Sequence, residues 1–293
     1  MSTGWSIFII VGTVISLIAF LWLLLGNRQK PTATVETMGH DFDGIQEYDN
    51  PLPMWWVAMF LFTIFFAVAF LVYYPGLGNF AGVGHWSQQD QWRRDTERET
   101  ARVAPLYARL GGLSEEELHQ DPVAQQIGRR LFLNHCSTCH GVTAQGAFGF
   151  PNLTDSEWLW GGDYADIQTT ITQGRNAAMP AWGPMLKDAG VSDVVAYVRS
   201  LSGAEHDPAA ATRGKEKFAV CVACHGADAK GNKLFGAPDL TNDIWLYGGE
   251  PEQLSFTITH GRNGHMPSFK DVLSKEQIHI VAGYVTSLRT ADE

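Results

Sequence analysis

The four cysteines of this chain all belong to two copies of one pentapeptide, Cys-x-x-Cys-His. Two thiols about one helical turn apart can bond the two vinyl groups of a single porphyrin, and the histidine that follows then presents its imidazole to the iron. The pattern therefore predicts two covalently bound haems c. The residues concerned are Cys136, Cys139 and His140 in the first copy and Cys221, Cys224 and His225 in the second.

One such pentapeptide by itself is also compatible with two other kinds of site. Two Cys-x-x-Cys pairs could together supply the four ligands of a tetrahedral zinc ion, and a single pair could be a thioredoxin-like redox centre. A redox pair belongs to a βαβ pattern, whereas strand signals are sparse here. The haem interpretation further requires a second axial ligand downstream of each motif, which makes the following residues decisive.

The sequence repeats itself downstream of the two motifs. PNLTDSEWLWGG at 151–162 corresponds to PDLTNDIWLYGG at 238–249, and ITQGRNAAMPAW at 171–182 corresponds to ITHGRNGHMPSF at 258–269. A repeat of this length indicates two homologous small domains in tandem. Domains of this size have little core of their own, and a haem supplies apolar bulk.

A methionine followed by proline occurs at the same place in each copy of the repeat. These residues are Met179 and Met266, whereas Met185 has no counterpart and is interpreted as core filler. A thioether is a soft ligand that suits haem iron and raises its reduction potential. From the order of the chain we expect two six-coordinate irons, ligated by His140 with Met179 and by His225 with Met266.

Other polar residues near the two methionines are further candidates. Arg175 and Arg262 each stand four residues before the methionine of their copy. A guanidinium there could pair with a haem propionate, although a solvated surface arginine is the alternative. In the second copy, His260 and His265 leave ligation by two histidines open.

Each copy also contains the helices that a small cytochrome c needs. A helix is predicted at 122–135 behind the N-cap residue Asp121, and another at 208–220 leads into the second motif. Amphipathic helices at 192–201 and 275–288 end the two copies. The predicted fold class is all-α.

The N-terminal third differs in kind, because it contains two uncharged apolar runs at 5–25 and 54–74. Each is long enough to span a bilayer core of roughly 30 Å, and the second has aromatic residues at both ends. The first run lacks the basic n-region and the A-x-A site of a cleaved signal peptide, so we expect a retained helix.

Positive charge beside the first span predicts the orientation in the membrane. The loop after this span carries Arg28 and Lys30, whereas the short N-terminal tail has no lysine or arginine. The loop is therefore expected in the cytoplasm, with both chain ends and the haem domains on the periplasmic side of a bacterial inner membrane. Attachment of c-type haem on that side agrees with this orientation.

The sequence predicts six segments, and the net charge of the chain argues against nucleic acid as a partner. The formal net charge of −10 argues against binding nucleic acid and suits a basic electron-donor protein. The segments are a first transmembrane helix (1–30), a cytoplasmic loop (31–53), a second transmembrane helix (54–75), a partly helical connector (76–120), and cytochrome c domains at 121–204 and 205–293.

Two stretches around the second span make a family resemblance specific. YDNPLPMWW at 48–56 and YPGLGNF at 74–80, together with the two haem motifs and their Met-Pro partners, resemble the dihaem subunit III of cbb3-type cytochrome c oxidases over essentially the full length. The resemblance implies two class I cytochrome c domains and a non-catalytic role. Electrons would pass from a soluble cytochrome c through this chain and a monohaem cytochrome c subunit to the haem–copper catalytic subunit, which reduces oxygen and pumps protons.

Two competing functions remain open from the residues alone. One is a free-standing membrane-bound dihaem shuttle that serves other complexes. The other is a dihaem peroxidase, which needs one haem with an open or displaceable sixth ligand. A Met-Pro in both copies argues against the peroxidase.

Overall fold

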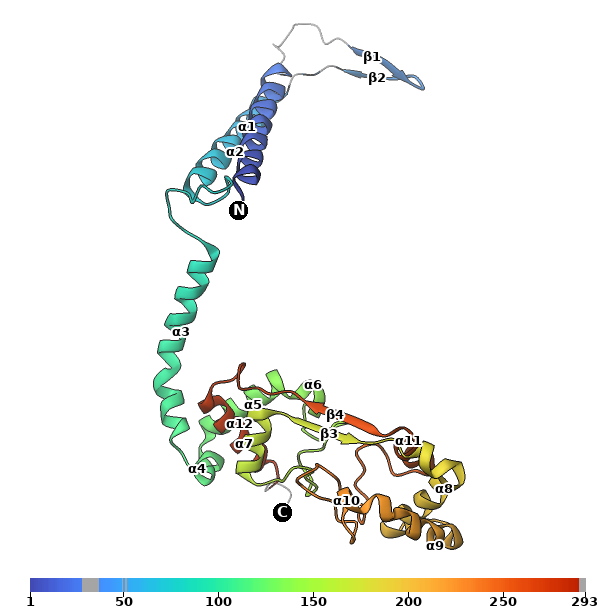
Figure 1. Cartoon of the computed structure of the whole chain (residues 1–293). Helices are drawn as coiled ribbons and strands as arrows, with labels where there is room; N and C mark the ends of the chain where they lie inside the picture. The colour runs from blue at the N-terminus through green and yellow to red at the C-terminus, as the bar shows by residue number, and fades with distance from the viewer. Residues whose placement is uncertain (28–36, 49, 51, 290–293) are drawn as a thin grey trace. The chain divides into compact units, whose positions relative to one another are not determined.

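The computed structural model describes residues 1–27, 37–48, 50 and 52–289, and it is mostly helical, as predicted (Figure 1). It contains two compact units, Met1–Arg102 and Val103–Glu293, and each is described by itself.

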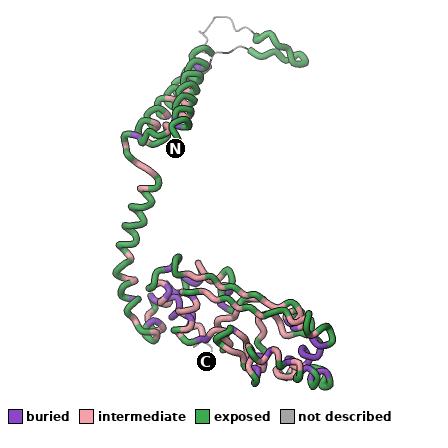
Figure 2. Tube along the Cα trace, viewed as in Figure 1, coloured by how far each residue is buried: buried purple, intermediate pink, exposed green. Residues whose placement is uncertain are grey.

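The first unit contains the two predicted spans as helices α1 (Thr3–Gly26) and α2 (Met54–Tyr73). Both are long and apolar enough to cross a membrane. Most of their residues are exposed (Figure 2), which is the arrangement expected of helices that lipid surrounds. Both predicted spans are confirmed as helices to within two residues at each end.

The loop after α2 is fastened to the start of α1. The backbone N–H of Asn79 donates to the hydroxyl of Ser6 over 2.9 Å, and Ser6 is one of the few buried residues of α1. Gly78 lies directly against Ser6 with a φ of +56°, where a side chain would collide. The YPGLGNF segment therefore holds the two helices together at this end.

The loop between the two helices contains a hairpin that the sequence analysis did not predict. Strands β1 (Thr37–Phe42) and β2 (Ile45–Tyr48) are antiparallel and fully exposed. They meet at an Asp43-Gly44 turn in which both residues have positive φ, the conformation that Asp-Gly favours in hairpins. Arg28 and Lys30, on which the predicted orientation depends, lie outside the described residues.

The second unit begins within α3, and three of the four helices predicted for it, α5, α9 and α12, start at the expected residue. Asp121 is the predicted N-cap and accepts hydrogen bonds from the N–H groups of Val123 and Ala124, and Asp207 caps its helix in the same way. The elements are α3 (Gln88–Gly111), α4 (Glu115–Gln120), α5 (Pro122–His135), α6 (Ser137–His140), α7 (Tyr164–Gln173), β3 (Arg175–Met179), α8 (Gly183–Leu201), α9 (Pro208–Lys217), η1 (Phe218–Val220), α10 (Val222–His225), α11 (Pro251–His260), β4 (Arg262–Met266) and α12 (Lys275–Ser287).

Two hydrophobic cores organise these elements into what we call the first and the second body. The first body packs α5 and α7 against α12, so Leu131 and Ile167 share a core with Val281. The second body packs α9 and α11 against α8, so Phe218 and Leu254 share a core with Val194. Each core therefore combines helices from both copies of the sequence repeat. The boundary predicted between residues 204 and 205 falls inside the second body, in the loop between α8 and α9.

The same helix crossing occurs in both bodies. Gly128 of α5 faces α12, where an added Cβ would lie 2.5 Å from the Cβ of Tyr284. Gly214 of α9 faces α8, where an added Cβ would collide with the carbonyl oxygen of Asp193. A glycine at each crossing lets the two helices approach closely.

A buried carboxylate links α8 to α9 in the second body. Asp193 is 6% exposed, and its oxygens accept hydrogen bonds from Arg213 over 2.7 Å and from Lys217 over 2.6 Å. These bonds, that of Arg213 foremost, hold the pKa of Asp193 below its ordinary value. An acid whose pKa is lower in the folded state stabilises the fold above the pKa of its unfolded state, about 3.9, and loses this contribution as the pH falls through the folded pKa.

Replacement of Asp193 by asparagine is therefore expected to lower the thermal stability of the second unit at pH 7, because two cations lose their acceptor. The loss should shrink as the pH is lowered to the point where Asp193 itself is protonated. Thermal melts at several pH values would measure this effect. Asp188→Asn, at an exposed position of the same helix, is the control; equal effects of the two changes at pH 7 would contradict the prediction.

Candidate haem sites

Each Cys-x-x-Cys-His motif forms a single helical turn at the end of a longer helix. The N–H of His140 donates to the carbonyl of Cys136 over 3.0 Å, and His225 makes the same bond to Cys221. The turn places the two thiols of a motif one turn apart, and a glycine with positive φ ends it in both copies. This is the local geometry that attachment of one porphyrin by two thioethers requires.

Both motif histidines are buried and held in one orientation. The Nδ1 of His140 lies 2.9 Å from the carbonyl oxygen of Pro151, and the Nδ1 of His225 lies 3.1 Å from that of Pro238. A carbonyl can only accept, so each Nδ1 carries the proton and Nε2 keeps its lone pair for a metal. Burial lowers the pKa of both imidazoles, which keeps them neutral and able to ligate iron. The residues present thus fit a haem c in both copies.

The cysteine thiols and their surroundings are also compatible with a haem c at each motif. Burial, followed by the neighbouring thiol, raises the pKa of Cys136 and of Cys221 to about 11 before any haem is attached. All four cysteines are free of disulfides. Nowhere in the described part of the chain do three or more histidine, cysteine or acidic side chains converge as they would on a metal ion. The alternative of one zinc site shared by the two motifs therefore has no support in the structure.

The two candidate axial methionines lie on neighbouring strands. β3 and β4 pair antiparallel, with Met179 opposite Arg262 and Met266 opposite Arg175 (Figure 1). Alternate residues of each strand are half-buried, so Met266 points to the opposite face from His265, whose Nδ1 lies 2.6 Å from the amide oxygen of Asn176. The register therefore favours methionine over His265 as a ligand.

The packing places each methionine in the body of the other copy's motif. Met266 packs against the core that contains Cys136, whereas Met179 packs against the core that contains Cys221. The structure thus brings together the opposite combination from the one expected from the order of the chain.

Both predicted arginines occupy equivalent sites, each formed by a threonine and an aromatic ring that the sequence analysis did not single out. The Nε of Arg175 donates to the hydroxyl of Thr170 over 2.9 Å, and its guanidinium lies 5.0 Å from the ring centre of Trp160. Arg262 contacts Thr257 and the ring of Tyr247 in the same way. The threonine and the aromatic ring stand at matching positions of the two copies, so an alignment of the repeat could have identified them. Both guanidinium groups keep N–H donors that these contacts leave available for a carboxylate.

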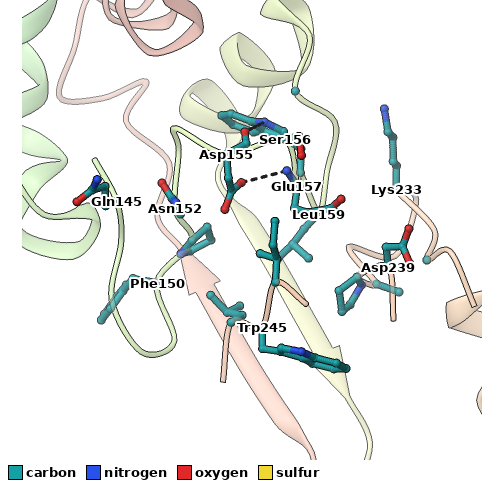
Figure 3. A pocket seen from close by; sticks show the side chains of 18 of the residues that line it. Gln145, Phe150, Asn152, Asp155, Ser156, Glu157, Leu159, Lys233, Asp239 and Trp245 are labelled. Carbon is teal, nitrogen blue, oxygen red and sulfur yellow. Dashed lines mark hydrogen bonds between the residues drawn. The ribbon is translucent and has the colours of Figure 1, made fainter. Parts of the chain in front are cut away.

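A cleft of about 660 Å³ separates the segments that follow the two motifs (Figure 3). Pro151 and Pro238, whose carbonyls orient the two histidines, both line this cleft. The two prolines whose carbonyls orient the motif histidines therefore lie beside the same cleft. The cleft also holds Asp155, which accepts from the N–H of Glu157 over 3.0 Å, and the side chain of Asp239 from the second copy.

Glu157 is expected to oppose folding at neutral pH. Burial, then the charges of Asp239 and Asp155, raise its pKa. An acid with a raised pKa lowers the stability of the fold as the pH rises above its unfolded value of about 4.3. Glu157→Gln should therefore raise the melting temperature at pH 7 and change little near pH 4. Thermal melts at both pH values test this, and a rise of the same size from the exposed control Glu205→Gln would contradict it.

These features define a class of protein, a c-type cytochrome with two candidate haem sites that follow, in the sequence, two helices able to cross a membrane. The family described as the cbb3-type cytochrome c oxidase subunit III matches residues 123–198 and 209–285, and the N-terminal domain of cytochrome oxidase-cbb3, FixP, matches residues 34–81. The chain belongs to this family of cbb3-type oxidase subunits, as the resemblance implied.

Full-length relatives give the same assignment. The chain is similar to the cbb3-type cytochrome c oxidase subunit CcoP of Rubrivivax gelatinosus, with 45% identity over 98% of this chain and 95% of the relative. It is 40% identical to the subunit FixP of Azorhizobium caulinodans over 86% of this chain and 92% of the relative. It is 38% identical to CcoP of Cereibacter sphaeroides over 89% and 97% of the two chains. Cytochrome c domains of this family imply covalently bound haem c.

Proposed function

We propose that this chain is the dihaem electron-relay subunit of a cbb3-type oxidase. Its haems would take single electrons from a soluble cytochrome c and deliver them, through a monohaem cytochrome c subunit, to the haem–copper subunit that reduces oxygen and pumps protons. The observation that carries the proposal is that each site offers a buried histidine and a methionine, because two strong-field axial ligands leave no coordination position for a substrate.

The residues of the chain have distinct roles in such a relay. Bound haem supplies reversible one-electron chemistry at iron. Cys136, Cys139, Cys221 and Cys224 would attach it, and the neutral Nε2 of each motif histidine would hold the iron from one side. Arg175 and Arg262 would bind the propionates, and the aromatic rings beneath them would keep both guanidinium groups in place.

The membrane helices would keep the relay beside its electron acceptor. The start of α1 and the end of α2 lie together, where Asn79 bonds to Ser6, so the N-terminus and the chain that follows α2 would lie on the same side of the membrane. We place that side in the periplasm of a bacterial inner membrane, where c-type haem is attached. The net charge of −10 favours encounter with a basic donor.

Purification of the chain in mild detergent through a C-terminal tag tests the proposal. Two haems c per chain together with haem b, copper and cyanide-sensitive oxygen uptake would support an oxidase subunit. Two haems c without haem b or copper would replace the proposal with a free-standing membrane-bound shuttle. A high-spin haem c in the untreated protein, with peroxide reduction, would indicate a peroxidase instead.

A further inference from the structure

The β1–β2 hairpin between the two spans has two chemically different faces. Phe42 pairs with Ile45 across the strands, so their side chains share one face, and Asp41 pairs with Gln46 on the opposite face. On that second face the side-chain amide of Gln46 donates to the carboxylate of Asp41 over 3.4 Å. Phe42 is 64% exposed and Ile45 is 69% exposed. One face is therefore polar and bonded within itself, and the other is apolar and open.

The turn of the hairpin fixes which residues stand on the apolar face. Asp43 and Gly44 have φ of +54° and +89°, and the carboxylate of Asp41 accepts from the N–H of Gly44 over 2.6 Å. A turn of this kind sets the register of the strands, and a slip by one residue would move Phe42 to the other face. The sequence therefore specifies that Phe42 and Ile45 stand together.

The hairpin does not have a core of its own to cover this face. Every residue of β1 and β2 is exposed, so the hairpin shares no core with the rest of the described first unit (Figure 2). A two-stranded hairpin alone in water is marginally stable at best, and exposed apolar side chains stabilise it only when another apolar surface covers them. The open face therefore points to a binding partner.

The length of chain between the hairpin and α2 limits where that partner can be. Only residues 49–53 separate the end of β2 at Tyr48 from the start of α2 at Met54. Six residue steps span at most about 22 Å even when fully extended. The hairpin therefore stays close to the membrane surface from which α2 begins, and its partner must present a surface there.

The charge of the loop distinguishes a protein surface from lipid. Residues 31–53 contain no lysine or arginine. Lipid headgroups of the cytoplasmic leaflet are negative and attract basic segments, so they repel this loop. Cytoplasmic loops of membrane proteins instead carry an excess of lysine and arginine, which complements it. The acidic residues of the loop are Glu36, Asp41, Asp43, Glu47 and Asp49.

We propose that the β1–β2 hairpin docks on a lysine- and arginine-bearing cytoplasmic surface of the membrane-embedded haem–copper subunit. Phe42 and Ile45 form the apolar centre of this contact. Asp43 in the turn and Glu47, which shares a face with Ile45, form its acidic rim. The inference rests on the proposed function, because it requires both the oxidase complex and a cytoplasmic position of this loop.

A photoreactive side chain on the apolar face tests the docking in the complete complex. p-Benzoylphenylalanine is incorporated at position 42 of the full chain, where an aromatic side chain already stands, and is activated by light in intact membranes. The complex is then purified in mild detergent through a C-terminal tag. We expect a covalent adduct with the polypeptide that binds haem b and copper. The same group at position 46, on the opposite face, is the control and should give little of this adduct.

The other outcomes separate the docking from the proposed function. An adduct with lipid only, with a soluble protein or with a second copy of this chain, or no adduct at all, would overturn the docking while haem b and copper still co-purify. Equal adducts from positions 42 and 46 would overturn the assignment of the docking face. Absence of haem b and copper from the purified protein would overturn the proposed function itself.

Neutralisation of the rim tests the charge of the partner surface. Asp43→Asn with Glu47→Gln keeps the side-chain sizes, and asparagine accepts the positive φ of the turn. The adduct at position 42 should fall roughly fivefold, because two exposed ion pairs are lost, and the remaining adduct should respond little to salt. Asp95→Asn with Glu97→Gln, at exposed positions of α3, removes the same charge elsewhere and is the control. An unchanged yield in the rim variant would overturn a basic partner surface.

Discussion

Replacement of Cys221 and Cys224 by alanine is expected to leave one covalent haem per chain instead of two. Both thiols of the motif are then lost, and no other cysteine of the chain is free to take their place. Haem content per chain, measured as the pyridine haemochrome, should fall by about half. Transfer from reduced cytochrome c to oxygen in the purified complex should fall to background if the relay needs both haems. Val222→Ala, between the two cysteines, is the control, and two haems retained in the double variant would contradict the assignment of this motif.

The same double variant should also weaken the second body. Cys221 is 8% exposed and packs in the core with Phe218 and Leu240, around the space that the haem would occupy. A core of this size depends on the apolar bulk of its cofactor. The second body should therefore become sensitive to limited proteolysis at temperatures where the unaltered protein resists it.

Replacement of Gly214 by alanine is expected to destabilise the second body by about 1–3 kcal/mol, the usual cost of overpacking a tight site. The new Cβ would collide with the carbonyl oxygen of Asp193, which is backbone and cannot move aside without displacing α8. The gain in helix propensity from glycine to alanine, at most about 1 kcal/mol, opposes this effect but does not remove the collision. Denaturant unfolding of the full chain, followed by far-ultraviolet circular dichroism, measures the change.

Lys215→Ala provides the matched control for this change. It places alanine at the next position of α9, which is exposed, and should alter stability by less than about 0.5 kcal/mol. Equal stability of the Gly214→Ala and Lys215→Ala proteins would show that α8 and α9 do not cross at Gly214.

The shared strand pair has a consequence for how the two haem sites behave. Met179 and Met266 stand at opposite ends of one small antiparallel sheet, each beside the arginine of the other copy. Displacement of one strand therefore moves both a candidate axial methionine and an arginine proposed to bind a propionate. The two sites are joined through backbone hydrogen bonds as well as through the cleft between their motifs.

Local patterns in the sequence determined the haem motifs, the two spans and the starts of several helices. The two motifs, the two spans and the Asp-Pro helix starts at 121–122 and 207–208 depend on neighbours within a few residues, and the structure confirms the helices that they predict. The family assignment followed from contiguous stretches as well. The error in the predicted start of one helix also has a local cause. α8 begins at Gly183 rather than at 192, because two helical pieces join across the positive φ of Lys187, which no periodicity reveals.

Only the tertiary structure decided which methionine lies beside which motif. Two copies of one repeat offer each helix two similar partners, and the order of the chain favours the nearer one. The choice rests on contacts between residues far apart in sequence, such as Gly128 with Tyr284 and Gly174 with Met266. The sequence contained one indication of this packing. Asp193 and Arg213 form an ion pair, whereas Ile280 and Ile127 at the equivalent positions of the repeat pack as apolar side chains. This difference is informative only when the facing helices are known. Local spacing therefore determined the residues of each candidate site, and long-range packing determined which methionine lies beside which motif.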